Sequence, residues 1–381
     1  MRARVSNAAL ALGLAALSGC GAGGDDAPAP VEAYRWPLGY GLPEPRVPED
    51  NPMSEAKVEL GRHLFYDPRL SGNQTQSCAS CHKQELAFTD GRATSEGSTG
   101  ERTRRSSMSL ANVAYAASFT WANPTLLGLE EQALTPLLGE RPVELGLRGR
   151  EDEMLERLRA EPRYAPLFAA AFPGPGDPFT LGHVTRALSS FERRILSGSS
   201  PYDRFQYGRE NDAISDAAKR GARLFGSEKL ECFHCHAGFN FQDGVTYVGK
   251  PPNFAFQNNG LYNVDGKGGY PATDTGLYEF TGKPADMGRF RVPTLRNVAV
   301  TAPYMHDGSI ATLSEVLDHY AAAGRTLPDG PNAGVGSANP YKSPFLVGFE
   351  LSEGERADVL AFFDSLTDHE LLTDPALADP W

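Results

Sequence analysis

Apolar side chains along the chain recur at the spacing of amphipathic helices, and the clearest case is Thr312–Gly324. One face of this segment is apolar and carries Leu313, Val316, Leu317 and Tyr320. Thr312 and Glu315 have the spacing of a capping box at the first turn, and Gly324 is a typical helix end. The pattern therefore predicts a helix that carries the Tyr320 phenol inward, where it is either core or a ligand.

Similar patterns predict helices that begin near Ser54 and near Ser215, and a last helix capped by Ser352 and Glu355. The first two share a short repeat, "GRHLF" from Gly61 and "GARLF" from Gly221. This duplication predicts a mainly α protein with two similar helical domains in tandem, long loops and little β structure.

Length and composition agree with two domains. The chain has 381 residues, with 40 glycines and 29 prolines, so many loops are expected. The net charge of −12 argues against a nucleic-acid partner, which requires a basic face. We place the first domain at 52–205, the second at 206–372 and a short tail at 373–381.

The N-terminus has the pattern of an export signal. Arg2 and Arg4 precede an apolar run too short to span a membrane, which ends in "LSGC" at Cys20. We interpret 1–19 as a lipoprotein signal peptide and Cys20 as the lipid-bearing residue, with 20–51 as a tether and N-terminal extension. This predicts a periplasmic protein held at the outer membrane, which contacts the membrane only through that lipid.

The remaining four cysteines form two C-x-x-C-H motifs, "CASCH" and "CFHCH". This motif is the attachment signature of c-type haem: two thioethers hold the porphyrin, and the following histidine binds the iron. The sequence predicts two covalent haems, attached at Cys78, Cys81, Cys232 and Cys235. A four-cysteine zinc site, a thioredoxin-type dithiol and structural disulfides are weaker alternatives, because none requires a histidine after each pair.

His82 and His236 then supply the proximal ligands, and the opposite side of each iron decides its function. No histidine lies between His82 and His183, so the first haem is predicted to be five-coordinate and open to peroxide. The candidate sixth ligands of the second haem are Met287, Met305, His306, His319 and Tyr320.

Longer stretches resemble the bacterial di-haem cytochrome c peroxidase and MauG superfamily. They are "LGRHLFYDPRLSGNQTQSCASCH", "EEQALTPLLGERPVELG" and "FRVPTLRNVAVTAPYMHDGSIATLSEVLDHY". "SLANVAY", "ECFHCH" and "LDHYAA" are most similar to its MbnH-like branch. The resemblance implies two cytochrome c-like haem domains. It also implies that Tyr320, where the peroxidases have methionine, is the sixth ligand of the second iron.

The resemblance assigns further roles by position. Trp121 matches the tryptophan between the two haems, and Gln132 and Glu144 match an amide and a catalytic acid above the first haem. Taken alone, Glu144 would be a solvated loop carboxylate. A calcium ion between the haems is implied by Thr301 and Pro303, whereas the family's asparagine ligand is replaced by Ser106.

The activity implied is a reaction with hydrogen peroxide that forms a high-valent state shared by both haems. In MauG-like members this state oxidises tryptophan residues of a partner protein. In MbnH-like members the partner is small, periplasmic or lipid-anchored and MbnP-like, and one of its tryptophans is converted to kynurenine. One alternative is a peroxidase that takes electrons from a small cytochrome or cupredoxin. A second is a di-haem electron carrier, which requires both irons to be six-coordinate.

Overall fold

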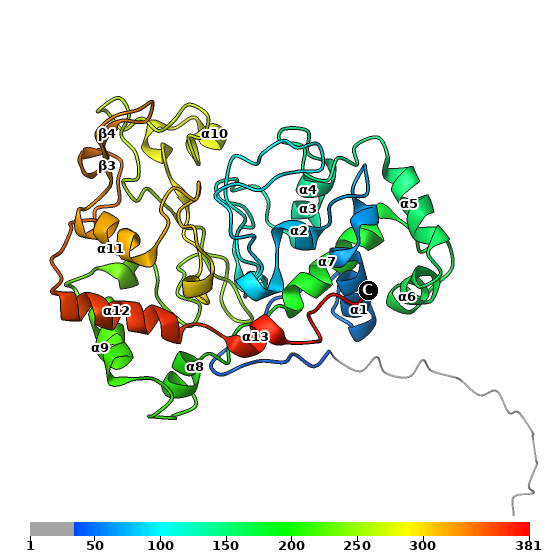
Figure 1. The fold of residues 1–381 in the computed structure, drawn as a ribbon. Helices are drawn as coiled ribbons and strands as arrows, with labels where there is room; N and C mark the ends of the chain where they lie inside the picture. Colours follow the sequence, from blue (N-terminus) through cyan, green and yellow to red (C-terminus); the bar gives the residue numbers. More distant parts are fainter. Residues whose placement is uncertain (1–33) are drawn as a thin grey trace, which may run out of the picture. The chain divides into compact units, whose positions relative to one another are not determined.

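The computed structural model describes residues 34–381, and Tyr34–Trp381 forms one compact unit. The predicted signal peptide, Cys20 and the first part of the tether lie outside the described residues. Within the described chain the structure is mainly helical, with short strands and long loops, as the sequence predicts (Figure 1).

The helices lie mostly in the first half and at the C-terminus. They are α1 Glu55–Tyr66, α2 Cys78–Cys81, α3 Leu129–Gln132, α4 Leu134–Leu138, α5 Glu151–Ala160, α6 Tyr164–Ala171, α7 Leu181–Arg194, α8 Pro201–Gln206, α9 Asp216–Phe225, α10 Tyr278–Thr281, α11 Leu313–Ala321, α12 Glu353–Ser365 and α13 His369–Thr373.

Short 3₁₀ helices connect several of these elements, and two antiparallel pairs of two-residue strands are also present: β1 Phe256–Gln257 with β2 Phe290–Arg291, and β3 Thr326–Leu327 with β4 Gly334–Val335. The register of the first pair places Phe256 opposite Arg291. This pair fixes the backbone of Arg291, which lines a cavity.

The repeated glycines mark two helix crossings of the same kind. Gly61 places α1 against α7, so close that a Cβ at this position would lie 2.0 Å from the carbonyl oxygen of Ala187. Gly221 places α9 against α12 in the same way, with a Cβ position 1.9 Å from the carbonyl oxygen of Asp358. Each crossing lies in its own hydrophobic cluster, and Figure 1 shows both pairs side by side.

The predicted helix starts are confirmed. Ser54 accepts a hydrogen bond from the Lys57 amide, and Ser215 accepts one from the Ala218 amide. Thr312 and Ser352 each form a complete capping box with the glutamate three residues later. The helix at Thr312 ends earlier than Gly324, because Ala323 adopts a left-handed conformation with φ 56° and the Gly324 amide bonds back to the His319 carbonyl.

The C-terminal residues pack on the first hydrophobic cluster. Leu371 and Leu377 belong to that cluster, and the Tyr66 hydroxyl donates to the Leu377 carbonyl over 2.7 Å. Trp381 packs edge-on against His63, with 5.5 Å between the ring centres. The tail at 373–381 thus packs against α1. The boundary between the domains at 52–205 and 206–372 stays a prediction. None of the described helices combines the length and apolarity that crossing a membrane requires.

Candidate functional site

Both C-x-x-C-H motifs form a short helical turn that presents the cysteines and the histidine together. Cys78 and Cys81 are the ends of α2, and Cys232 begins a 3₁₀ turn that Cys235 caps. All four thiols are unpaired and half-buried, which excludes disulfides between them in this structure. Geometry therefore agrees with thioether attachment at each pair.

Each motif histidine is held by its Nδ1 atom, so that Nε2 remains available for a metal. His82 Nδ1 lies 2.8 Å from the Phe88 carbonyl, and His236 Nδ1 lies 2.9 Å from the Phe241 carbonyl. A backbone carbonyl on one ring nitrogen fixes the orientation and tautomer of a ligating histidine. Burial lowers the pKa of His82 and lowers that of His236 to about 4, so both rings are neutral, the form that binds iron.

The first motif opens onto a cavity of about 370 Å³. His82, Gln132 and Glu144 line it, and burial raises the pKa of the Glu144 carboxyl. Among the described residues that line this cavity, His82 is the only histidine and Met108 the only methionine. The Met108 sulfur accepts a hydrogen bond from the Arg291 guanidinium over 3.1 Å. The lining therefore offers acid–base groups, and its described residues include no second histidine and no methionine free of a hydrogen bond.

The second motif opens onto a separate cavity of about 240 Å³, which is mainly apolar and which Tyr320 also lines. Burial raises the pKa of Tyr320 to about 12, and a hydrogen bond with the Asn259 side chain opposes this shift. Asn259 also donates to the Met305 sulfur over 3.2 Å. The structure thus brings the Tyr320 phenol and His236 to one cavity. His319, another candidate sixth ligand, is buried and outside the lining.

Met287 and His306 remain from the earlier candidates for the second iron. Met287 is not among the lining residues, whereas His306 lines the cavity and stacks on Phe290 at 3.7 Å between ring centres. Its Nε2 atom lies 3.9 Å from the Asp274 carboxylate. Stacking and this acid account for His306 without a metal.

Trp121 lies between the two cavities, since it lines both. Its indole Nε1 donates to the Ser106 carbonyl over 2.9 Å, and its own carbonyl accepts from the Arg291 amide over 2.7 Å. Ser107 and Met108 also line both cavities, so one strip of chain separates them. The position of Trp121 agrees with the role that the resemblance implies.

The residues proposed for calcium come together near this strip. Ser106, Thr301 and Pro303 all line the second cavity. The Ser106 hydroxyl donates to the Met305 carbonyl over 3.1 Å, and the Thr301 hydroxyl donates to the Val298 carbonyl over 3.2 Å. Both hydroxyls are thus engaged within the chain, and calcium at this place stays a prediction.

Sequence reasoning missed Glu192, a carboxyl group in the wall of the first cavity. Glu192 is buried on α7 and its Oε2 atom has no partner within the described chain. Burial raises its pKa to about 8. It follows Leu188 by four residues on the buried stripe of that helix, and an acid on an apolar stripe is the signal that could have revealed it.

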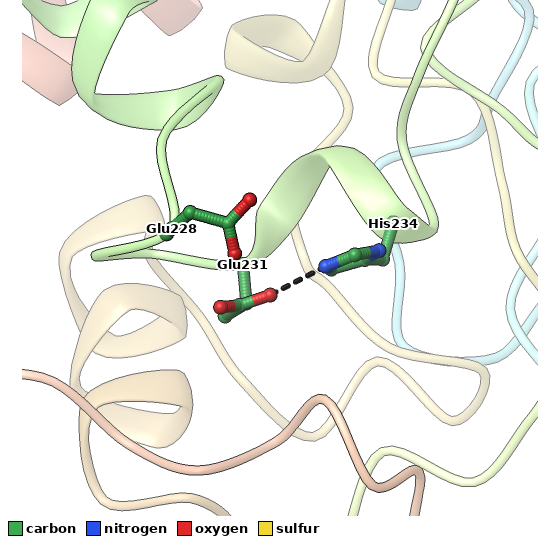
Figure 2. A group of neighbouring side chains, drawn as sticks. All are labelled: Glu228, Glu231 and His234. Carbon is green, nitrogen blue, oxygen red and sulfur yellow. Dashed lines mark ion pairs between the residues drawn. The ribbon is translucent and has the colours of Figure 1, made fainter.

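A surface cluster beside the second motif has a simpler explanation. Glu228, Glu231 and His234 bring potential ligand atoms within 4.8 Å of one another. Figure 2 shows the Glu231 carboxylate directed at the His234 ring, with Oε2 and Nε2 2.5 Å apart. The ring also stacks on Phe345 at 3.9 Å between centres. Ion pairing and stacking account for this arrangement, and Glu228 is exposed.

The residues of both cavities fit a covalent haem. Each cavity combines two free thiols, a neutral histidine with a fixed ring, and a mainly apolar lining. Two buried donors in the second cavity also lack a partner within the described chain: Arg291 Nε and Gln242 Nε2. Such groups are expected where a polar part of a ligand belongs.

The chain has extended similarity to known proteins. Residues 55–211 match the family described as di-haem cytochrome c peroxidase. The methylamine utilization protein MauG of Methylorubrum extorquens is 35% identical over 321 residues, which cover 84% of this chain and 80% of that protein. The cytochrome-c peroxidase IdrP1 of Denitromonas iodatirespirans is 36% identical over 360 residues, with 90% and 88% covered.

Solved structures show the same relationship. A crystal structure of a MauG-like protein associated with microbial copper homeostasis superposes with a TM-score of 0.89 and 48% identity, covering 92% of this chain and 100% of that one. The di-haem peroxidase BthA of Burkholderia thailandensis shares the fold, with a TM-score of 0.65, 22% identity and coverage of 91% and 96%. The chain belongs to the di-haem cytochrome c peroxidase and MauG family, whose members carry two c-type haems and act as haem oxidoreductases with peroxide.

Proposed function

We propose that this protein uses hydrogen peroxide to oxidise a tryptophan of a small partner protein. The observation that carries the proposal is the inequality of the two cavities. The first offers His82 and acid–base groups, and its one methionine is bound by Arg291. The second presents Tyr320 in the same cavity as His236. One site is thus suited to peroxide and the other to storing charge.

Residues of the first cavity transfer protons to and from peroxide. When bound, the haem supplies the redox chemistry of peroxide reduction. Glu144 lines the cavity, and burial raises the pKa of its carboxyl group above the ordinary value, which favours proton uptake and release at this place. Its carboxylate accepts the proton of one peroxide oxygen and returns it to the other, as general acid–base catalysis requires. Gln132 is in the same lining and can orient the peroxide by hydrogen bonding.

Tyr320 and Trp121 serve the second requirement, which is to hold oxidising power until a partner arrives. As an iron ligand, the Tyr320 oxygen would stabilise the oxidised metal, because an anionic phenolate lowers its reduction potential. Trp121 lines both cavities and its indole is fixed by the Ser106 carbonyl. These two side chains favour a charge shared by both sites over rapid turnover with a small electron donor.

Two relatives support the choice of a partner class. One similar structure is described as a MauG-like protein associated with microbial copper homeostasis, and one relative is named MauG. We propose a small periplasmic or lipid-anchored partner of the MbnP-like kind, with one tryptophan converted to kynurenine. We also propose that the protein itself is periplasmic and held at the outer membrane by lipid on Cys20. Calcium at Ser106, Thr301 and Pro303 remains part of this proposal.

The test combines the full di-haem protein, peroxide and the protein encoded by the adjacent gene. Mass spectrometry of the partner is expected to show oxygen added to one tryptophan, and an unchanged partner mass would refute the proposal. Trp121→Phe is expected to slow the modification. Trp381→Phe is the matched control, because Trp381 packs against His63 and lines neither cavity.

A peroxidase that only removes peroxide is the second candidate. Relatives named cytochrome-c peroxidase IdrP1 match this chain at 36% identity over most of its length, which favours it. Rapid steady-state turnover with reduced cytochrome or cupredoxin, together with an unmodified partner, would support this function instead. Failure of the reduced first haem to bind carbon monoxide would instead support a simple electron carrier.

A further inference from the structure

The wall of the second cavity contains a buried cation with no acid to balance it. Arg291 is 8% exposed and forms no ion pair with any described carboxylate. Its Nη1 donates to the Ser118 carbonyl over 2.7 Å, and its Nη2 donates to the Met108 sulfur over 3.1 Å. Its Nε has no partner within the described chain. A buried charge without a counter-ion is costly, so one is expected at this place.

Other buried arginines of the chain show the usual solution. Arg296 is fully buried and forms two hydrogen bonds with the Asp203 carboxylate, of 2.7 and 2.9 Å. Arg193 is paired in the same way with Glu130. Arg291 departs from this pattern, and burial lowers its pKa to about 10. The counter-ion expected for the Arg291 guanidinium is therefore a group that is not part of the protein chain.

A second donor lies in the wall of the same cavity. Gln242 is 4% exposed and its Oε1 accepts from Asn240 over 3.1 Å, whereas its Nε2 has no partner among the described residues. Both Gln242 and Arg291 line the second cavity and neither lines the first. Two unsatisfied N–H donors, one of them cationic, are the chemistry that binds a carboxylate.

We propose that Arg291 and Gln242 bind the carboxylate side chains of the haem attached at Cys232 and Cys235, with Arg291 as their counter-ion. A porphyrin of the c type carries two propionates, and this haem is the one whose attachment cysteines line the same cavity. The inference rests on the cofactor of the family and not on the identity of the final substrate.

Arg291 would also connect this haem to the strip between the cavities. Its amide donates to the Trp121 carbonyl and its guanidinium to Ser118 and Met108, so one residue holds the carboxylates and the strip together. It would position the haem relative to Trp121 and raise its reduction potential, because a nearby cation favours the reduced iron.

The test is a spectroelectrochemical titration of the intact di-haem protein, without peroxide or partner. Arg291→Gln is expected to lower the equilibrium constant for reduction of this haem by about tenfold, which corresponds to about 59 mV for one electron. Arg291→Lys, which keeps the charge, is expected to restore most of the loss. The change seen in Tyr320→Phe identifies which signal belongs to this haem.

Arg289→Gln is the matched control, since its side chain is 40% exposed and lies only two residues away. It removes the same charge and is expected to leave the potential unchanged. An Arg291→Gln potential equal to that of Arg289→Gln would overturn the proposal. If Arg291→Gln yields no folded protein, Gln242→Leu decides: a drop on the order of threefold supports the proposal, and an unchanged potential refutes it.

Discussion

Replacing Gly221 by alanine sets two physical effects against each other. Alanine is favoured over glycine inside a helix by about 1 kcal/mol, so an isolated α9 would gain stability. In the folded chain, however, the new Cβ would lie 1.9 Å from the Asp358 carbonyl oxygen and 2.9 Å from the Phe362 Cβ. Since ordinary contacts begin at 3.4 Å, α9 and α12 would have to separate by roughly 1.5 Å.

The cost follows from what the alanine meets. The nearest atom belongs to the backbone of α12 and cannot rotate away, so relief requires moving a helix in a packed cluster. Overpacking of this kind typically costs about 1–3 kcal/mol, and this contact is at the severe end. After subtraction of the helix-propensity gain, we expect a net loss of about 2 kcal/mol, or a decrease of roughly 3 °C in the unfolding midpoint of a unit of this size.

The assay is thermal unfolding of the di-haem protein followed by far-ultraviolet circular dichroism. Gly354→Ala is the control: Gly354 lies in α12, and a Cβ there meets nothing within 4 Å, so its midpoint should rise slightly. Opposite signs for the two substitutions are the expected result. If Gly221→Ala were as stable as Gly354→Ala, the close crossing would not be the reason for the repeated glycine.

Three further outcomes test the site. Glu144→Gln should slow the reaction with peroxide about 100-fold, as measured by stopped-flow absorbance. Glu140 is exposed in the same loop, so Glu140→Gln should react at the wild-type rate. Equal rates for the two variants would exclude Glu144 as the proton carrier. Tyr320→Met should shift the spectrum of the second haem towards methionine-type bands, and an unchanged spectrum would show that Tyr320 is not the ligand. Because burial raises the pKa of Glu192 to about 8, the folded protein binds more protons than the unfolded chain between its ordinary pKa and pH 8, so stability falls as pH rises. Glu192→Gln should therefore have a higher unfolding midpoint than wild type at pH 8 and a similar one at pH 4, and equal midpoints at both would contradict the raised pKa.

The sequence by itself determined what depends on neighbours in the chain. In "CFHCH" the residues that attach a haem and bind its iron lie within five positions, so the motif can be recognised without knowledge of the tertiary structure. The helix starts at Ser54 and Thr312 were equally readable, because a cap bonds to an amide only a few residues away. The repeat that contains Gly61 and Gly221 likewise indicates a duplicated helical architecture.

Only the tertiary structure decided which side chains face which cavity. Glu144 has the sequence context of a solvated loop, yet the fold places it in the lining of the first cavity and leaves it only half-exposed. The sequence gives no sign that Arg291 lines the second cavity or that Glu192 lines the first. Each has a polar atom without a partner, because the surrounding groups belong to segments far away in the chain. Periodicity records which face of a helix is buried, whereas the groups that surround a buried charge depend on how distant segments pack.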